Sequence, residues 1–173
     1  MNLGFKIHSF DNANSVPWEY YPTCVDCEVG SIMSQGIVAG NTVVIPNTTP
    51  GDLTAGNLPF YICMTKVSGL WKQNKSAQPE NYKFKDVAVV AIRNDMILEG
   101  VRVGPGSAGD ANIVFLYAIQ DDEYKVNWML RGDTSAEANT SSTAWQFKEL
   151  SSEPLGIEIY GQPAYKVLVR YIG

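Results

Sequence analysis

The sequence predicts an all-β domain with little helix, and three observations support this. Short runs rich in β-branched and aromatic residues recur along the chain, bounded by Gly, Pro, Asn or Asp. No apolar stripe with the 3.6-residue period of a helix persists for more than about two turns. The chain has 173 residues, 45% of them hydrophobic, which is enough for one domain with a sizeable core. Many short strands separated by Gly and Pro turns favour a barrel or a sandwich.

Two apolar runs, residues 59–64 and 87–92, are the strands around which the predicted domain is organised. They are joined by a long polar stretch, residues 68–86, which we expect to be a surface loop. Trp71 and Tyr82 are isolated aromatic residues inside this loop. They either clamp the loop to the body of the domain or contact a partner.

Further strands are predicted on both sides of these runs, at residues 28–46, 97–103, 113–117 and 124–130. The clearest β-hairpin closes the chain, with strands at residues 155–160 and 165–171 and a turn at 161–163. The two-residue alternation of the second strand places Val167 and Val169 on one face.

We expect residues 1–17 to form an extended N-terminal arm outside the core, and residues 18–173 to form a single β-domain. Three apolar residues, Leu3, Phe5 and Ile7, alternate in the arm before a polar stretch and a proline. Either they bind the arm to a partner chain, or the segment is a frayed terminus with one short strand.

An aromatic cluster follows the arm, at Trp18, Tyr20 and Tyr21. Trp and Tyr dominate binding hot spots, so these residues are candidate contact residues. The alternative is that they cover the domain's own core, since aromatic burial is a common source of stability in small β-domains.

Cys24 and Cys27 form a CxxC motif, which indicates a redox pair or half of a zinc site. No helical pattern follows the motif, as a thioredoxin-type pair would require. A zinc site would need two more ligands, and Cys63 and His8 are the candidates, although the spacing matches no common ligand pattern. The alternative is that the cysteines are small buried residues near a turn. No metal or other cofactor is therefore predicted.

Charge and motif content exclude several classes of function. The net charge is −5 and no three Lys or Arg are consecutive, so we expect no nucleic-acid partner. No apolar run approaches the length that spans a bilayer or forms a signal peptide, so we expect no membrane partner and synthesis in the cytoplasm. Residues 104–110 are Gly-rich but lack the Lys and helix of a phosphate-binding loop, and we interpret them as a loop at an internal division of the domain. No catalytic motif is present, and we expect no enzyme activity.

The order of five segments resembles the head decoration (capsid cement) proteins of tailed phages. These segments are residues 19–22 (EYYP), 28–33 (EVGSIM), 59–64 (PFYICM), 87–92 (VAVVAI) and 166–171 (KVLVRY). The chain departs from the family pattern in the CxxC motif, in the 68–86 loop and in residues 120–150, which puts the loops and contacts of these regions outside the resemblance.

The resemblance implies a compact β-barrel-like or β-tulip fold without catalytic residues. It also implies a virion structural protein that binds the major capsid protein on the outer capsid surface, as a trimer or other homo-oligomer, and stabilises the shell. A protein that binds only the assembled shell lowers the free energy of that state.

Two other functions stay open from the sequence. One is a carbohydrate- or receptor-binding β-module, in which Trp71, Tyr82 or Trp145 stack on sugar rings. The other is a zinc- or redox-dependent enzyme that uses the three cysteines and His8.

Overall fold

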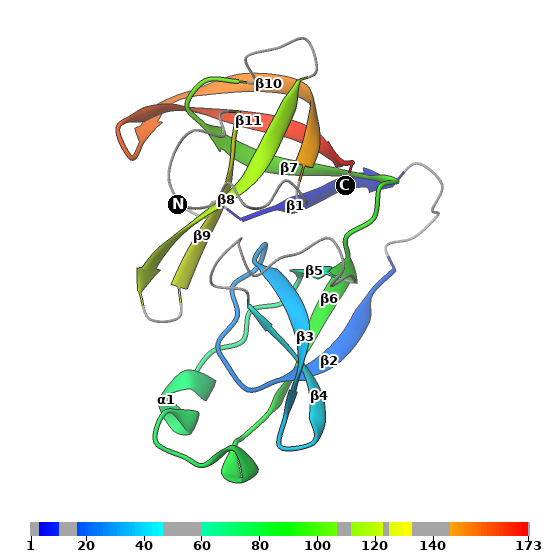
Figure 1. The fold of residues 1–173 in the computed structure, drawn as a ribbon, viewed down its shortest axis with the longest axis vertical. Coiled ribbons are helices and arrows are strands. Elements are labelled where there is room, and N and C mark those ends of the chain that lie inside the picture. Colours follow the sequence, from blue (N-terminus) through cyan, green and yellow to red (C-terminus); the bar gives the residue numbers. More distant parts are fainter. Residues whose placement is uncertain are drawn as a thin grey trace.

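The computed structural model describes residues 4–10, 17–46, 60–106, 112–122, 125–132 and 146–172. The chain is nearly all β, as predicted, and its strands form two curled sheets that lie one beyond the other along the long axis (Figure 1). Within these residues the helices are one short α-helix, α1 (Leu70–Asn74), and one 3-10 turn, η3 (Pro79–Asn81). Both lie in the stretch predicted as a polar loop.

The five-stranded sheet is built from consecutive strands in the spatial order β2-β6-β5-β3-β4. All of its pairings are antiparallel. Its two edge strands approach each other, so the sheet is strongly curled (Figure 1). The strands are β2 (Glu19–Thr23), β3 (Ile32–Val38), β4 (Asn41–Pro46), β5 (Phe60–Cys63) and β6 (Lys85–Ala91).

The six-stranded sheet has the order β1-β7-β11-β10-β8-β9. Its strand β9 returns to β7 through one parallel pair, Arg102 with Leu130, so the sheet curls into a small barrel with β1 attached outside. The predicted barrel-like architecture is therefore confirmed. The strands are β1 (Lys6–Phe10), β7 (Met96–Val103), β8 (Ile113–Asp122), β9 (Lys125–Arg131), β10 (Gln146–Ile159) and β11 (Gln162–Tyr171).

The central strands of the five-stranded sheet are buried on both faces. Ile62 and Val90 belong to an apolar cluster shared with the six-stranded sheet, which includes Trp128. The alternate residues Tyr61 and Val89 face a second cluster on the other side of their own sheet. This double burial explains why the two organising runs are continuously apolar instead of alternating. The shared cluster joins both sheets into one core.

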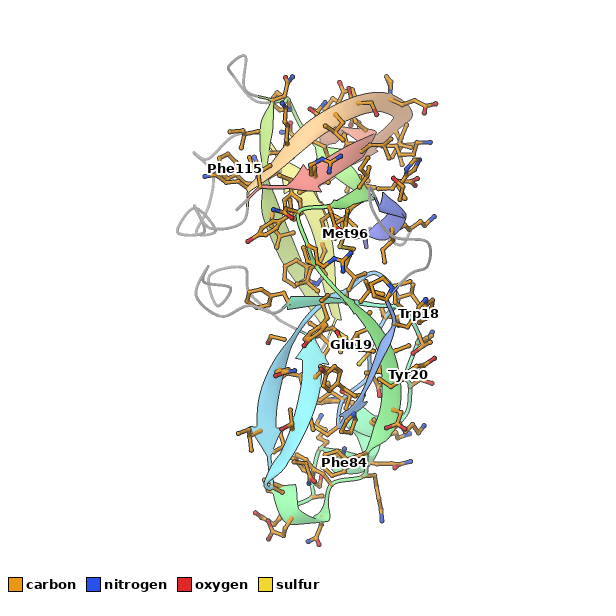
Figure 2. The ribbon with its side chains drawn as sticks, turned by 90° about the vertical axis from the view of Figure 1, so that its right-hand side faces the viewer. Trp18, Glu19, Tyr20, Phe84, Met96 and Phe115 are labelled. Carbon is orange, nitrogen blue, oxygen red and sulfur yellow. The ribbon has the colours of Figure 1, made fainter. Side chains whose placement is uncertain are left out.

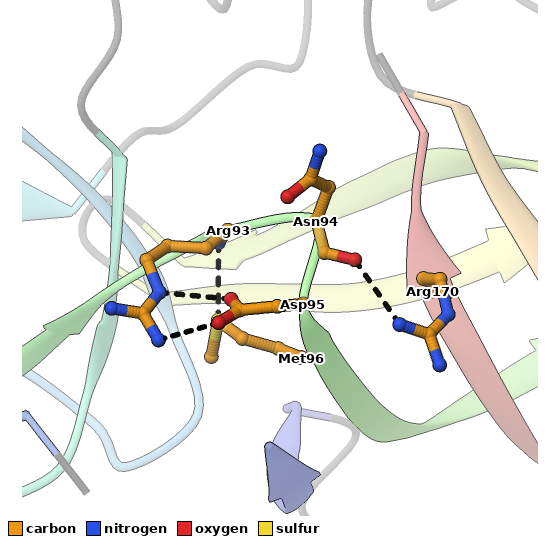
Figure 3. A network of polar contacts seen from close by, with 5 residues as sticks. All are labelled: Arg93, Asn94, Asp95, Met96 and Arg170. Atoms are coloured by element: carbon orange, nitrogen blue, oxygen red, sulfur yellow. Dashed lines mark hydrogen bonds and ion pairs between the residues drawn. The ribbon is translucent and has the colours of Figure 1, made fainter. Parts of the chain in front are cut away.

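A short crossover carries the chain from β6 into β7, and Figure 2 places Met96 near the middle of the molecule, where the two sheets meet. The guanidinium of Arg93 donates to both carboxylate oxygens of Asp95, at 2.9 and 2.8 Å, and its backbone N–H donates to Met96 Sδ at 3.1 Å (Figure 3). Arg170 on β11 donates to the Asn94 carbonyl at 3.2 Å. The chain therefore passes from the five-stranded to the six-stranded sheet at residues 92–95, earlier than the predicted internal division at residues 104–110.

The N-terminal segment differs from the predicted arm. Strand β1 pairs with β7, and its register shifts between Ile7 and Ser9. Phe5 is 1% exposed and stacks on Phe147, with the ring centroids 5.9 Å apart. Residues 5–10 are thus part of the domain, because a single aromatic side chain anchors the segment in the shared core.

The closing hairpin forms as predicted, with Val167 and Val169 buried. Its turn lies one residue earlier than predicted, at Tyr160 and Gly161, whose φ angles are 50° and 74°. Positive φ at both central residues is the type I′ geometry that matches the twist of a hairpin.

Candidate interaction surface

Two exposed aromatic side chains lie at strand β2, at one edge of the five-stranded sheet: Trp18 directly precedes the strand and Tyr20 is in it. Trp18 is 46% exposed and Tyr20 is 70% exposed. Figure 2 shows both at the margin of the molecule, with Glu19 between them along the chain. Pro22 lies in the same strand, and proline is tolerated on an edge because it has no N–H to offer a neighbouring strand. We call Trp18 and Tyr20 the aromatic edge.

Tyr21 holds this edge in place. Its ring packs against buried Tyr61, with centroids 5.5 Å apart, and the two hydroxyls are 3.4 Å apart. The Tyr21 hydroxyl also donates to Glu19 Oε1 at 3.3 Å. Because neighbouring residues of a strand point to opposite faces, anchoring Tyr21 inward leaves Tyr20 on the other face. The two interpretations of the aromatic cluster therefore apply to different residues: Tyr21 covers the core, and Trp18 and Tyr20 are exposed.

A second apolar surface lies on the outer part of the β10–β11 hairpin. Strand β10 pairs with β8 only over residues 146–148, and the rest of it pairs, among the described strands, with β11 alone. Four large apolar side chains of this part are between 39% and 51% exposed: Leu150, Leu155, Ile157 and Tyr160. Sequence reasoning missed this surface because an apolar residue in a predicted strand carries no sign of whether another element covers it.

A bulge in β10 bends this part of the hairpin. The register with β11 shifts between Pro154 and Glu158, and Gly156 has a φ of 72°. Leu155 and Ile157 line an open groove of about 370 Å³, together with Gly4, Lys6, Glu99, Gly100, Val101 and Lys166.

The other predicted contact residues are less accessible. Phe5 is in the core, which removes it as a contact residue, and Ile7 is partly buried against the same cluster. Trp71 on α1 and Tyr82 after η3 are both half-buried. Lys75 Nζ lies 6.0 Å from the centre of the Trp71 ring. Leu3 and Trp145 lie outside the described residues.

The polar stretch that carries Trp71 is tied to the body by two buried or half-buried side chains. Asp26 Oδ1 accepts hydrogen bonds from the first two backbone N–H groups of α1, at 2.8 and 3.1 Å. Asn74 Nδ2 donates to the carbonyls of Cys24 and Lys83, at 2.7 and 2.9 Å. The stretch therefore packs against the five-stranded sheet, which a polar composition alone does not indicate.

The predicted metal ligands are not gathered into one site. Cys24, Cys27 and Cys63 are free and buried, whereas His8 is exposed on β1, in the other sheet. In the part of the chain that the structure describes, no three His, Cys, Asp or Glu side chains are placed to hold a metal ion. Cys27 and Cys63 lie in the same buried apolar cluster of the five-stranded sheet.

No protein-family model, curated protein or solved structure matches this chain. Within the described residues, no helix has the length and apolar character needed to cross a membrane.

Proposed function

We propose that this chain is a virion structural protein that binds the outside of a phage head and stabilises the shell. The observation that carries the proposal is the aromatic edge, where Tyr20 on β2 and Trp18 directly before it are exposed, and where Tyr21 fixes the strand to the core. Large, rigid aromatic side chains give much contact area for little loss of conformational entropy. The ordered strand segments that resemble head decoration proteins support the same function.

The partner in this proposal is the major capsid protein, with the chain attached as a trimer or other homo-oligomer after synthesis in the host cytoplasm. Attachment occurs through side chains, because Pro22 weakens β2 as a template for another strand. Binding to assembled shells, but not to free subunits, stabilises the assembled state by mass action.

The test is co-sedimentation of the purified protein with assembled shells that lack it. The variant Trp18→Ala/Tyr20→Ala should bind at least about tenfold more weakly than the wild type, which corresponds to about 1.4 kcal/mol. Ile37→Ala is the matched control, since Ile37 is 78% exposed on β3, away from the aromatic edge along the chain. The thermal unfolding midpoint of each variant verifies that the fold is retained. Wild-type binding by the double variant, or no binding by the wild type, would contradict the proposal.

A carbohydrate- or receptor-binding module is the second candidate, because the same two exposed rings offer flat faces to a ligand. Here the exposed residues are Trp18 and Tyr20, since Trp71 and Tyr82 are half-buried. A glycan array followed by titration of tryptophan fluorescence separates the two functions. Micromolar binding of a sugar that Trp18→Ala abolishes would favour this module over the capsid protein.

A further inference from the structure

The outer part of the β10–β11 hairpin is exposed along its whole length. Every residue of β10 from Leu150 to Glu158 is exposed, although a strand of a packed sheet normally buries alternate side chains. Among the described strands this part of β10 pairs with β11 alone, and Figure 1 shows the hairpin turn at the margin of the molecule. A two-stranded ribbon of this kind gains stability when a further element packs on it.

The groove that the hairpin borders differs in charge from the chain as a whole. Its charged lining residues are Lys6, Lys166 and Glu99, two cations and one anion, whereas the net charge of the chain is −5. Apolar side chains of β7 and β10 complete the lining. A segment that binds in this groove should therefore combine apolar side chains with carboxylates.

The hairpin itself exposes a segment of this composition. Glu153 and Glu158 flank Leu155 and Ile157, and all four side chains lie in the exposed run. Lys166 is the register partner of Glu153, and its Nζ lies 3.4 Å from Glu153 Oε2. These two side chains are 45% and 71% exposed, so their ion pair is weak and Lys166 stays accessible to a second carboxylate. Groove and segment thus adjoin on one chain and are complementary in charge and in apolar character.

A two-fold axis brings the groove of each of two copies to the segment of the other, because both copies then use the same surface. With the axis near Gly156, the two segments run antiparallel and their apolar side chains pack together. Glu158 of each copy then lies beside residue 154 of the other. That position adjoins Glu153, the register partner of Lys166, so Lys166 is placed to bind the second carboxylate.

The segment is a poor template for a continuous sheet between copies. Pro154 has no N–H to donate, and Gly156, with a φ of 72°, lies in the bulge that interrupts the ladder with β11. Contact is therefore made through side chains, and a closed two-fold contact stops at two copies.

We propose that residues 153–158 and the adjoining groove are the contact through which two copies of this chain form a homodimer. The dimer deepens the proposed function, in which the chain attaches as a homo-oligomer, and its role on a shell rests on that function. The dimer itself is measured on the isolated protein. A failure to dimerise is therefore distinct from a failure to bind shells through Trp18 and Tyr20.

The experiment is sedimentation velocity of the isolated protein over a range of concentrations. We expect a species of twice the 19.0 kDa chain mass, with a dissociation constant in the micromolar range because the contact is small and partly polar. Ile157→Asp should raise that constant at least about tenfold, since it places a carboxylate among apolar side chains. Leu150→Asp is the matched control: Leu150 is 44% exposed on the same strand but does not line the groove, so this variant should dimerise like the wild type. Circular dichroism verifies that each variant is folded.

Charge reversal tests the pairing of Lys166 with Glu158 of the second copy. Lys166→Glu and Glu158→Lys should each dimerise at least about tenfold more weakly than the wild type, because each places like charges together at both ends of the contact. An equimolar mixture of the two variants should recover the dimer, since a mixed pair has opposite charges at both ends. Only a contact between copies produces this recovery, and a loss of folding does not.

A monomer at every concentration, a trimer, or a dimer that Ile157→Asp leaves intact would each overturn the proposal. A mixture of the two charge-reversal variants that dimerises as weakly as its components would do the same. A monomeric wild type whose Ile157→Asp variant loses binding to shells would assign the groove to the capsid protein, and would overturn the second copy as its occupant.

Discussion

Phe5 lies directly against Gly30. Its backbone N–H donates to the Gly30 carbonyl at 3.0 Å, and a Cβ on Gly30 would lie 2.7 Å from the Phe5 carbonyl oxygen. Gly30 also has a φ of 88°, a conformation that residues with a side chain rarely adopt. The start of the chain and the segment after the CxxC motif are thus in contact at a point where only glycine fits.

Gly30→Ala should lower the free energy of unfolding by about 3 kcal/mol, because it combines left-handed strain with a backbone clash. Gly40→Ala is the matched control: its φ is 79°, but nothing lies within 4 Å of an added Cβ. That variant should lose only about 1 kcal/mol, from strain alone. Urea unfolding of both proteins measures the difference, and equal losses would show that the contact with Phe5 is unimportant.

Phe5→Ala should destabilise the protein by about 4 kcal/mol, since it removes a fully buried aromatic side chain that stacks on Phe147. Ile7→Ala, at a partly buried position of β1, the strand that follows Phe5, should cost about 1 kcal/mol. Guanidinium unfolding curves provide both values. A Phe5→Ala protein as stable as the wild type would restore the interpretation of this segment as an arm outside the core.

Ala39→Asn should stabilise the protein by about 1 kcal/mol. Ala39 and Gly40 form the β3–β4 turn with φ angles of 48° and 79°, the type I′ geometry in which Asn-Gly is the preferred pair. Ala39 is exposed, so no packing changes. A rise in the thermal unfolding midpoint is expected, and an unchanged or lower midpoint would mean that the strain at Ala39 is relieved elsewhere.

Arg102→Ala should cost about 3 kcal/mol, because it leaves a nearly buried carboxylate without its partner. Arg102 Nε donates to Glu149 Oε1 at 2.9 Å, and the guanidinium carbon lies 4.3 Å from the centre of the Tyr165 ring. The side chains of Arg102 and Glu149 are 7% and 12% exposed. Glu153→Ala removes the exposed ion pair with Lys166 and is the control, with an expected change below about 0.5 kcal/mol. Chemical denaturation measures the free energy of unfolding of both variants. A loss in Arg102→Ala as small as that in Glu153→Ala would contradict the prediction.

Alkaline pH should destabilise the protein partly through Tyr61. Burial raises the pKa of its hydroxyl above the ordinary value of 10.0. Because the folded state keeps the proton more tightly than the unfolded state, this stability is complete below about pH 10 and is lost as pH rises further. Tyr61→Phe should therefore show a smaller decrease in unfolding free energy between about pH 9 and pH 11 than the wild type. Equal decreases would assign the effect to other groups, such as Tyr171, whose pKa burial also raises.

Local patterns predicted much of this fold. The all-β class, the final hairpin and the two organising strands follow from side-chain alternation and turn residues, which act over a few positions. The helix α1 was not predicted, because its cap comes from Asp26, far away in the sequence. The burial of Phe5 also depends on a distant partner, Phe147.

The candidate surface was predicted only in part. Trp18 and Tyr20 were among the proposed contact residues and are exposed, but their exposure depends on Tyr21 finding Tyr61. The CxxC motif links Cys27 to Cys24, whereas the structure buries Cys27 in one apolar cluster with Cys63, which no local spacing indicates. In both examples, contacts between residues far apart in the sequence determine which side chains are buried. A single sequence does not show such contacts.

The five-stranded sheet is nested within the chain between β1 and β7, which are partners in the other sheet. During translation, β2 to β6 can therefore pair as they leave the ribosome, whereas β1 cannot pair with β7 until β7 has been synthesised. Strand β1 and strands β7 to β11 are thus needed together to complete one sheet, and a nascent chain stalled before β7 would carry the five-stranded sheet with β1 still unpaired.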